Sequence, residues 1–188
     1  MPDLSAFRPD PRQAALVIVD VQEKLSAAMP MDVLQQVVRH IGVLVAAANE
    51  FHFPVLLTEQ YPQGLGATLE AVKSPLADVT PLEKMSFSCC GVAEFCRQLQ
   101  VKQVRDILLV GMETHVCVTQ TALDLLTDQY RVFVPADAVC SRNKQNWRLG
   151  LELMRQAGAI IGSTEMFLFM MLGEAGTDRF RKLSKLVR

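Results

Sequence analysis

The sequence lacks any stretch rich in proline, glycine or serine that would link two separate domains. It has no GxGxxG motif and no Walker motif, the glycine-rich loops that usually cradle the phosphates of nucleotide cofactors. Internal repeats and low-complexity segments are also absent. A single domain over residues 1–188 is therefore expected, large enough to bury a substantial core, and no cofactor is predicted.

An excess of charge of either sign is missing as well. The 19 lysines and arginines nearly balance the 20 aspartates and glutamates, which excludes the broad basic face of a nucleic-acid-binding protein. No apolar run reaches the roughly 20 residues that a membrane span needs, and residues 1–13 do not resemble a signal peptide. These absences predict a soluble, cytoplasmic protein that acts on a small molecule, without a membrane or nucleic-acid partner.

Common metal-binding patterns are missing too. The three histidines, His40, His52 and His115, have no histidine or carboxylate partner at ligand spacing, so no metal site is predicted. The cysteines are odd in number and form no CxxC pair, which favours reduced thiols over disulfides or a zinc site. They are Cys89, Cys90, Cys96, Cys117 and Cys140.

Short apolar runs alternate along the chain with longer amphipathic segments. The runs expected to form strands are residues 15–19, 55–58, 82–85, 107–110, 131–134 and 159–162. The segments with helical spacing are residues 33–51, 92–100, 115–130 and 145–157. This alternation predicts an α/β fold, a three-layer α-β-α sandwich around a six-stranded, mainly parallel, Rossmann-like sheet.

Two features concern the ends of helices and of the chain. Asp32 directly precedes the helix expected over residues 33–51 and is placed to cap it. Residues 166–172 are apolar nearly all round, and a basic amphipathic segment, residues 179–188, follows them. Either the C-terminal helices over 164–188 form a subunit interface, which makes the protein a homo-oligomer of two or more copies, or they pack within their own chain.

Polar residues follow several of the expected strands, where ligands bind in an open parallel sheet. Asp20, with Gln22 after it, ends the first strand and either caps a loop or projects into the cleft. The second strand leads into "TEQYPQGLG", which reads as a solvated loop or as part of a site. Lys84, in the third strand, is either a surface residue at the sheet edge or a buried, paired charge.

Cys117 falls in the first turn of a helix that begins near Thr114 or His115. Unpaired amides and the helix dipole at such a position stabilise negative charge and lower a thiol pKa. Cys117 is therefore either a nucleophile or a small core residue, and His115 either caps the helix or lines a pocket. The other cysteines are expected in core or incidental roles, with Cys140 in a polar loop.

Several segments together resemble the isochorismatase-like cysteine hydrolases. "ALVIVDVQEKL" resembles the first strand of that superfamily with its aspartate at Asp20, and "LEKMSFS" its lysine segment with Lys84. "LLVGMETHVCVTQTALDLL" is similar to its nucleophile segment with Cys117, and "VFVPADAVCSR" to its fifth strand and the following loop. The resemblance covers residues 13–165 and implies the fold predicted above.

Within the superfamily, "TEQYPQGLG" resembles the second-strand loop of the cofactor-free isochorismatase domain-containing proteins. The nicotinamidases have a metal-binding aspartate and histidines in that loop, where this chain has Glu59 and Tyr61. The resemblance therefore implies neither a metal nor nicotinamidase activity.

The resemblance also implies roles for individual residues. Asp20, Lys84 and Cys117 would form a catalytic triad, with the backbone amides of Glu113 and Cys117 as the oxyanion hole. The family has a cis peptide at the position of Met112 and Glu113. The substrate pocket would include Gln22, Gln60, Tyr61, Phe87 and His115.

The expected activity is the hydrolysis of a small-molecule amide or related C–N bond through a Cys117 thioester. Some isochorismatases that cleave vinyl ethers lack the cysteine, so the presence of Cys117 favours acyl transfer. Three alternatives stay open: a vinyl-ether hydrolase, a catalytically silent interaction protein with this fold, and a thiol sensor.

Overall fold

The computed structural model describes residues 4–76 and 78–187. A central sheet runs through the domain in the order β3-β2-β1-β4-β5-β7, and the short strand β6 pairs with β4 beside this path. All the pairings between these strands are parallel. The strands are β1 Ala14–Val19, β2 Val55–Gln60, β3 Leu82–Lys84, β4 Asp106–Met112, β5 Arg131–Pro135, β6 Val139–Cys140 and β7 Ile160–Gly162.

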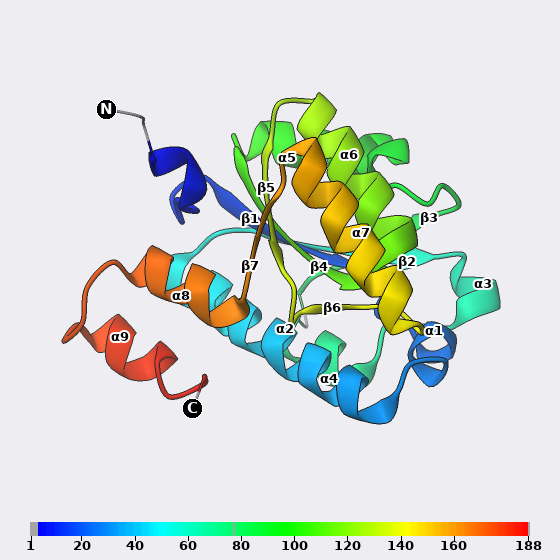
Figure 1. Ribbon diagram of the computed structural model, residues 1–188, viewed down its shortest axis with the longest axis horizontal. Helices are drawn as coiled ribbons and strands as arrows, with labels where there is room; N and C mark the ends of the chain where they lie inside the picture. Colours follow the sequence, from blue (N-terminus) through cyan, green and yellow to red (C-terminus); the bar gives the residue numbers. More distant parts are fainter. Residues whose placement is uncertain (1–3, 77, 188) are drawn as a thin grey trace.

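Helices cover both faces of the sheet, which makes three layers (Figure 1). The helices α5 Ala93–Val101, α6 Thr119–Thr127 and α7 Lys144–Ala157 lie on one face. The helices α2 Met31–Phe51, α4 Glu70–Lys73, α8 Thr164–Leu172 and α9 Asp178–Leu183 lie on the other. Short helices α1 Glu23–Ala27 and α3 Pro62–Leu65 follow the C-terminal ends of β1 and β2. The three-layer α/β prediction is confirmed, with one strand more than expected.

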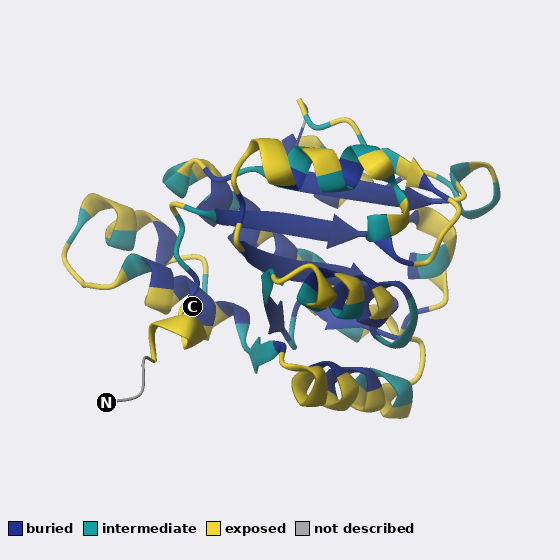
Figure 2. Cartoon of the chain, turned by 90° about the horizontal axis from the view of Figure 1, so that it is seen from above, coloured by how far each residue is buried: buried dark blue, intermediate teal, exposed yellow. Residues whose placement is uncertain are grey.

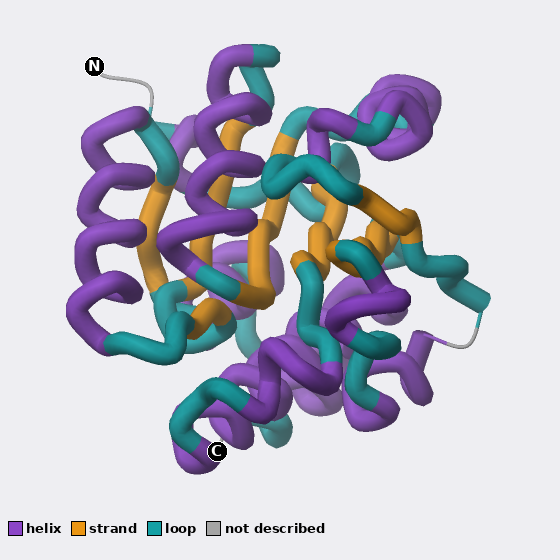
Figure 3. Tube along the Cα trace, turned by 90° about the vertical axis from the view of Figure 1, so that its right-hand side faces the viewer, coloured by secondary structure: helices purple, strands orange, loops and turns teal. Residues whose placement is uncertain are grey.

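Strand β1 shows why both faces carry helices. All six of its residues are buried, and successive side chains point to opposite faces of a strand. Leu16 and Ile18 belong to the core under α2, whereas Val17 and Val19 belong to the core under α5, α6 and α7. Figure 2 shows the resulting buried strands beneath helices that are exposed on their outer sides, and Figure 3 shows the strands between the two helix layers.

The structure corrects several details of the prediction. Asp32 does not cap α2, because the helix begins at Met31 and Pro30 holds the N-cap position. Cys140 is not in a polar loop but is buried in β6, a two-residue strand too short to give a periodic signal. The helix expected over residues 115–130 consists of a π-helical turn, Thr114–Val118, that continues into α6.

Helix α2 has the length and composition of a membrane span, contrary to the expectation that no apolar segment is long enough. The helix has 21 residues and carries few charges. In this fold one side of α2 packs on the sheet through residues such as Ile41, Leu44 and Ala48. An amphipathic covering helix therefore accounts for its apolar content.

Helix α8 has two apolar sides that differ in their surroundings. Phe167 and Leu168 are buried within the chain, and the Phe167 ring packs edge-on against Phe133 at 5.6 Å between centroids. Met166, Phe169 and Met170 are exposed. One side of α8 thus packs within its own chain, and the Phe169 ring also packs edge-on against Phe180 of α9. The subunit interface stays a prediction.

Candidate active site

Asp20 lies directly after β1 with its side chain fully buried. Its backbone has a φ of 51°, a left-handed conformation that is uncommon for a residue with a side chain. Thr58 donates a hydrogen bond to Oδ1 at 2.8 Å, and the Lys84 ammonium donates one to Oδ2 at 2.6 Å. Because both partners come from neighbouring strands, Asp20 projects into a polar cluster at the carboxyl edge of the sheet and does not cap a loop.

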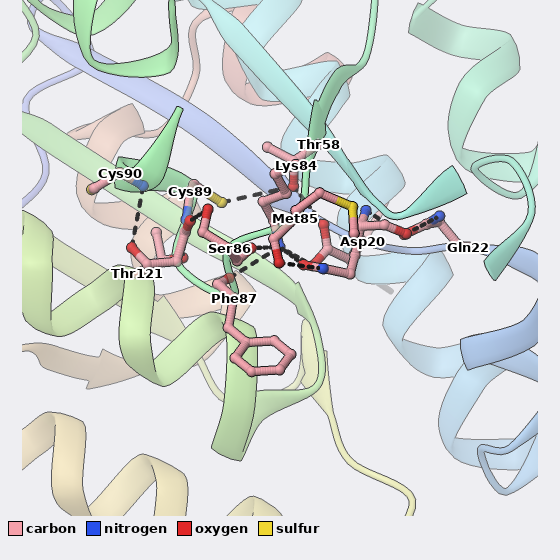
Figure 4. A network of polar contacts seen from close by, with 12 residues as sticks. Asp20, Gln22, Thr58, Lys84, Met85, Ser86, Phe87, Cys89, Cys90 and Thr121 are labelled. Atoms are coloured by element: carbon pink, nitrogen blue, oxygen red, sulfur yellow. Dashed lines mark hydrogen bonds and ion pairs between the residues drawn. The ribbon is translucent and has the colours of Figure 1, made fainter. Parts of the chain in front are cut away.

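Lys84 is buried although β3 is the edge strand of the sheet, so the surface alternative is wrong. Besides Asp20, its Nζ atom contacts Gln60 Oε1 at 2.7 Å and the carbonyl oxygens of Phe87 at 3.0 Å and Ser86 at 3.3 Å. Figure 4 shows the ammonium group at the centre of this network. A buried lysine is tolerated when acceptors and a counter-charge surround it, and all of these are present here.

Gln60 is itself fixed by Gln22, whose side chain is buried beneath it. Gln22 Oε1 accepts a hydrogen bond from the Gln60 amide at 2.7 Å, and Gln22 Nε2 donates to the Gln60 carbonyl at 3.0 Å. A second bond from Nε2 reaches the Gly66 carbonyl at 2.7 Å. Both glutamines therefore hold the backbone and Lys84, and their predicted contact with a substrate stays a prediction.

The segment "TEQYPQGLG" is only partly a solvated loop. Glu59 is buried and accepts hydrogen bonds from the backbone amide and the hydroxyl of Thr68, at 2.8 and 2.7 Å. Tyr61, in contrast, is 46% exposed. The solvated-loop reading is thus wrong for Glu59 and Gln60 and right for Tyr61.

Three exposed apolar side chains lie close to Lys84 in sequence or space. Tyr61 and Met85 line a hollow of about 340 Å³ together with Lys84. Phe87 is 54% exposed, and its ring points away from the polar network (Figure 4). Tyr61 and Phe87 are thus available to contact a ligand, as their prediction as pocket residues requires.

Cys117 lies in the π-helical turn after β4 and is 5% exposed. One turn later, Thr121 accepts a hydrogen bond from the backbone amide of Cys89 at 3.0 Å. This bond joins α6, which follows the turn with Cys117, to the segment that follows Lys84 (Figure 4). The side chains of Asp20 and Lys84 both act on the Cys117 thiol, so the structure brings the three together from the end of β1, from β3 and from the turn after β4.

The pKa of the Cys117 thiol is raised, contrary to the expected lowering. Burial raises the pKa of Cys117 to about 12, and the negative charge of Asp20 and a hydrogen bond to it also raise it. The positive charge of Lys84 acts in the opposite direction but is the smaller effect. Loss of water and a nearby carboxylate thus outweigh the helix N-terminus in setting the pKa of this thiol.

The turn between β4 and Cys117 has an unusual backbone. The Met112–Glu113 peptide bond is cis, as the resemblance implied. Gly111 has a φ of 114°, and a Cβ atom at this position would overlap the Val19 carbonyl oxygen of β1. The Glu113 carboxylate accepts a hydrogen bond from the Arg142 amide at 3.0 Å, which ties the turn to the segment after β6.

Thr114 and His115 follow the cis peptide. Thr114 Oγ1 is buried and has no hydrogen-bond partner among the described residues, so it leaves an unused polar group at the turn. His115 is half-buried, with Nδ1 at 3.0 Å from Ser141 Oγ and Nε2 at 3.3 Å from Asn146 Nδ2. His115 therefore connects the turn Thr114–Val118 to residues around the start of α7. Its role as a pocket residue stays a prediction.

Residues 4–76 and 78–187 contain no group of three or more histidine, cysteine, aspartate or glutamate side chains placed to hold a metal ion. All five cysteines are free thiols. The polar cluster is thus built from the triad candidates and the side chains that support them.

Comparison with known proteins identifies the family. The family model for the isochorismatase domain matches residues 14–166. A secreted isochorismatase effector from Phytophthora sojae is 38% identical over 183 residues, which cover 95% of this chain and 86% of the relative. Isochorismatase domain-containing protein 2 from Bos taurus is 34% identical over 95% of this chain and 84% of its own. The chain belongs to the isochorismatase family.

Comparison with solved structures also supports this fold. A structure described as the MAR1 ribonuclease from Caenorhabditis elegans superposes with a TM-score of 0.87 at 35% identity, over 96% of this chain and 92% of the other. The Escherichia coli YcaC protein, described as an octameric hydrolase of unknown specificity, gives a TM-score of 0.88 at 21% identity, over 99% and 92%. The second likeness concerns the fold alone, which is that of the family's hydrolases.

Several residues of this isochorismatase-family site were missed in the sequence. Thr58 supports Asp20, and Cys89 in turn donates a weak hydrogen bond to Thr58 Oγ1 at 3.7 Å. Thr121 holds the segment after Lys84. Their side chains carry no distinctive spacing, although Thr58, as a polar residue within the buried strand β2, was a signal that the sequence offered.

We expect Thr58→Val to lower both stability and catalytic rate. The variant removes one hydrogen bond to a buried carboxylate, so the free energy of unfolding should fall by about 1–3 kcal/mol. Thr58→Ser keeps the hydroxyl group and should keep kcat, which urea unfolding and steady-state kinetics on both variants would show. Equal kcat for Thr58→Val and the wild type would contradict a supporting role.

The buried thiols predict that stability falls at high pH. Burial raises the pKa of Cys89 to about 11 and those of Cys117 and Cys140 to about 12, from an ordinary 9.0. Above pH 9 the unfolded chain releases these protons and the folded chain keeps them. The stability is therefore complete below pH 9 and is lost as the pH rises toward 12, by about 1 kcal/mol per thiol at pH 10. Urea unfolding of the wild type and Cys140→Ala at pH 7 and 10 checks this, because the variant should lose less.

Proposed function

We propose that this chain is a cysteine hydrolase that cleaves an amide or related C–N bond of a small molecule, with Asp20, Lys84 and Cys117 as its catalytic triad. One observation carries the proposal. The buried Asp20 carboxylate bonds to the Lys84 ammonium at 2.6 Å and also acts on the Cys117 thiol, whose pKa it raises. Such a carboxylate is a base next to a thiol that needs one.

The first half of the reaction forms a thioester. Asp20 takes the proton of the Cys117 thiol while Sγ attacks the carbonyl carbon of the substrate. The negative charge moves to the carbonyl oxygen, which the backbone amides of Glu113 and Cys117 would bind. The intermediate collapses when the C–N bond breaks and Asp20 returns the proton to the leaving nitrogen.

The second half releases the acid and restores the thiol. Asp20 takes a proton from water, whose oxygen attacks the thioester carbon, and the C–S bond breaks as Cys117 regains a proton. Lys84 stays charged throughout and stabilises the negative charge that passes between Asp20 and Cys117. No step requires a cofactor.

Cys117 distinguishes this proposal from vinyl-ether hydrolysis, which does not require a thioester. Oligomerisation is part of the proposal as well, as two or more copies that pack through the exposed side of α8. Two observations support this part of the proposal: YcaC, which has the same fold, is described as octameric, and Met166, Phe169 and Met170 are apolar and exposed. A cytoplasmic location stays a prediction, consistent with five free thiols.

The test is a screen of small amides, ureides and enol ethers, combined with mass spectrometry of the intact protein during turnover. We expect an amide or ureide to be cleaved and a mass increase equal to its acyl group to appear on the Cys117 peptide. A short single-stranded RNA belongs in the screen, because one similar structure is described as a ribonuclease. Cleavage of the enol ether or the RNA alone, without an acyl adduct, would reject the proposal.

A further inference from the structure

A second cavity lies between the start of α2, the segment around β6 and the start of α7. It has a volume of about 450 Å³, within the roughly 300–1,000 Å³ usual for small-molecule sites. Its walls are mainly apolar and include Val33, Val37, Val139, Cys140 and Trp147. None of the triad residues is among those that line it, so this cavity is separate from the proposed catalytic centre.

The mouth of the cavity favours a negative charge. Lys144 lines it, is exposed, and has no hydrogen bond or ion pair to another described residue. Lys144 is also the first residue of α7, whose helix dipole is positive at this end. The acidic wall residue Asp137 already accepts two hydrogen bonds from Thr164 and faces His40 at 3.6 Å. An anionic group would therefore find an unpaired cation here.

The wall of this cavity is connected by hydrogen bonds to the turn that carries Cys117. Cys140 of β6 pairs in register with Met112, the residue before the cis peptide bond. Ser141 Oγ lies 3.0 Å from His115 Nδ1, and the next residue, Arg142, donates its amide to Glu113 Oε2 at 3.0 Å. One short segment, residues 140–142, thus contacts the cavity on one side and both neighbours of Thr114 on the other.

We propose that this cavity, lined by Trp147, Cys140 and Lys144, is a regulatory site for a small apolar carboxylate. The apolar body would fill the space between α2 and α7, and the carboxylate would pair with Lys144. Occupancy would fix the segment 140–142 and, through Glu113 and His115, restrain the turn that carries Cys117. The binding site stands independently of catalysis, whereas the regulation rests on the proposed function.

Trp147 is the only tryptophan of the sequence, so its fluorescence reports on the cavity without labels. We expect 4-phenylbutyrate to change its emission saturably and the neutral 4-phenyl-1-butanol to bind more weakly. Lys144→Met should weaken phenylbutyrate binding about tenfold, the loss of one charge-assisted contact. Lys185→Met removes an exposed lysine that follows α9 and should leave the affinity for phenylbutyrate unchanged.

Val33→Phe adds a ring to the cavity wall from α2 and should abolish the fluorescence change while the circular dichroism spectrum stays native. A signal that persists in Val33→Phe, or equal affinity for the acid and the alcohol, would overturn the site. So would the absence of saturation in folded wild type. An emission that follows protein concentration and ignores the probe would show that a second copy covers the cavity, which also overturns the proposal.

Coupling to the nucleophile is tested with iodoacetamide and mass spectrometry of the Cys117 peptide. Saturating phenylbutyrate should slow the labelling of Cys117 at least threefold in the wild type and leave it unchanged in Val33→Phe. An unchanged rate at full occupancy would overturn the regulation. Because neither readout uses turnover, a failure of the proposed hydrolase activity would be visible separately.

Discussion

Replacing Cys117 by alanine should reduce hydrolysis by at least about a thousandfold, because Cys117 is the nucleophile that forms the thioester in the proposed mechanism. The melting temperature should change by less than about 4 °C, since a buried cysteine behaves as a small apolar residue and alanine fills most of its space. Steady-state kinetics on the substrate found in the screen, with differential scanning calorimetry, measure both quantities.

Cys117→Ser and Cys140→Ala are the matched controls for this variant. Serine keeps a hydroxyl group at the same position but is a far weaker nucleophile, so it should be nearly as inactive as alanine. Cys140→Ala removes another buried thiol, which belongs to the other hydrophobic core cluster, and should retain activity. Activity that survives in Cys117→Ala while stability drops sharply would make Cys117 a core residue and remove the basis of the thioester mechanism.

Asp20, Lys84 and Cys117 could be placed at one edge of the sheet from the sequence because of how parallel sheets are built, whereas their roles as a triad came from the resemblance to the family. Each strand of such a sheet ends at the same edge, so Asp20, Lys84 and Cys117 converge although 97 residues separate the first from the last. The apolar runs indicated where the strands lie, and the polar residues at the ends of these runs were therefore expected at the carboxyl edge of the sheet. Sequence reasoning could not decide whether Asp20 and Lys84 were buried, because burial depends on which helices and loops cover the edge.

The raised pKa of Cys117 could not be predicted from the sequence for a similar reason. The local pattern showed a helix N-terminus, which lowers a thiol pKa, but not the distant carboxylate and the burial that raise it. The supporting roles of Gln22 and Gln60 were equally hidden, since nothing in the sequence distinguishes a glutamine that binds a ligand from one that supports the site. Only the hydrogen bonds to the Gln60 backbone and to Lys84 reveal that both hold the site together.

Replacing Lys84 by methionine should have the largest effect on stability. The Asp20 carboxylate and the Lys84 ammonium form an ion pair with both side chains fully buried. Removing the lysine leaves an unpaired carboxylate in the interior, and losing one partner of such a pair costs about 3–5 kcal/mol. We expect the free energy of unfolding to fall by this amount and activity to be lost, as measured by urea unfolding and the hydrolysis assay. Lys185→Met, at an exposed lysine, should leave both unchanged.

The double variant Asp20→Asn with Lys84→Met separates the structural contribution of the pair from its catalytic one. With both charges gone, the interior no longer holds an uncompensated ion, and replacement of a buried pair by neutral side chains is often nearly neutral for stability. The double variant should therefore be more stable than Lys84→Met and remain inactive, because it has no base for the Cys117 thiol. The single variant Asp20→Asn completes the comparison. If the stability losses of Asp20→Asn and Lys84→Met simply add up to the loss of the double variant, Asp20 and Lys84 do not interact in the folded protein. If the double variant hydrolyses the substrate, neither residue belongs to the catalytic triad.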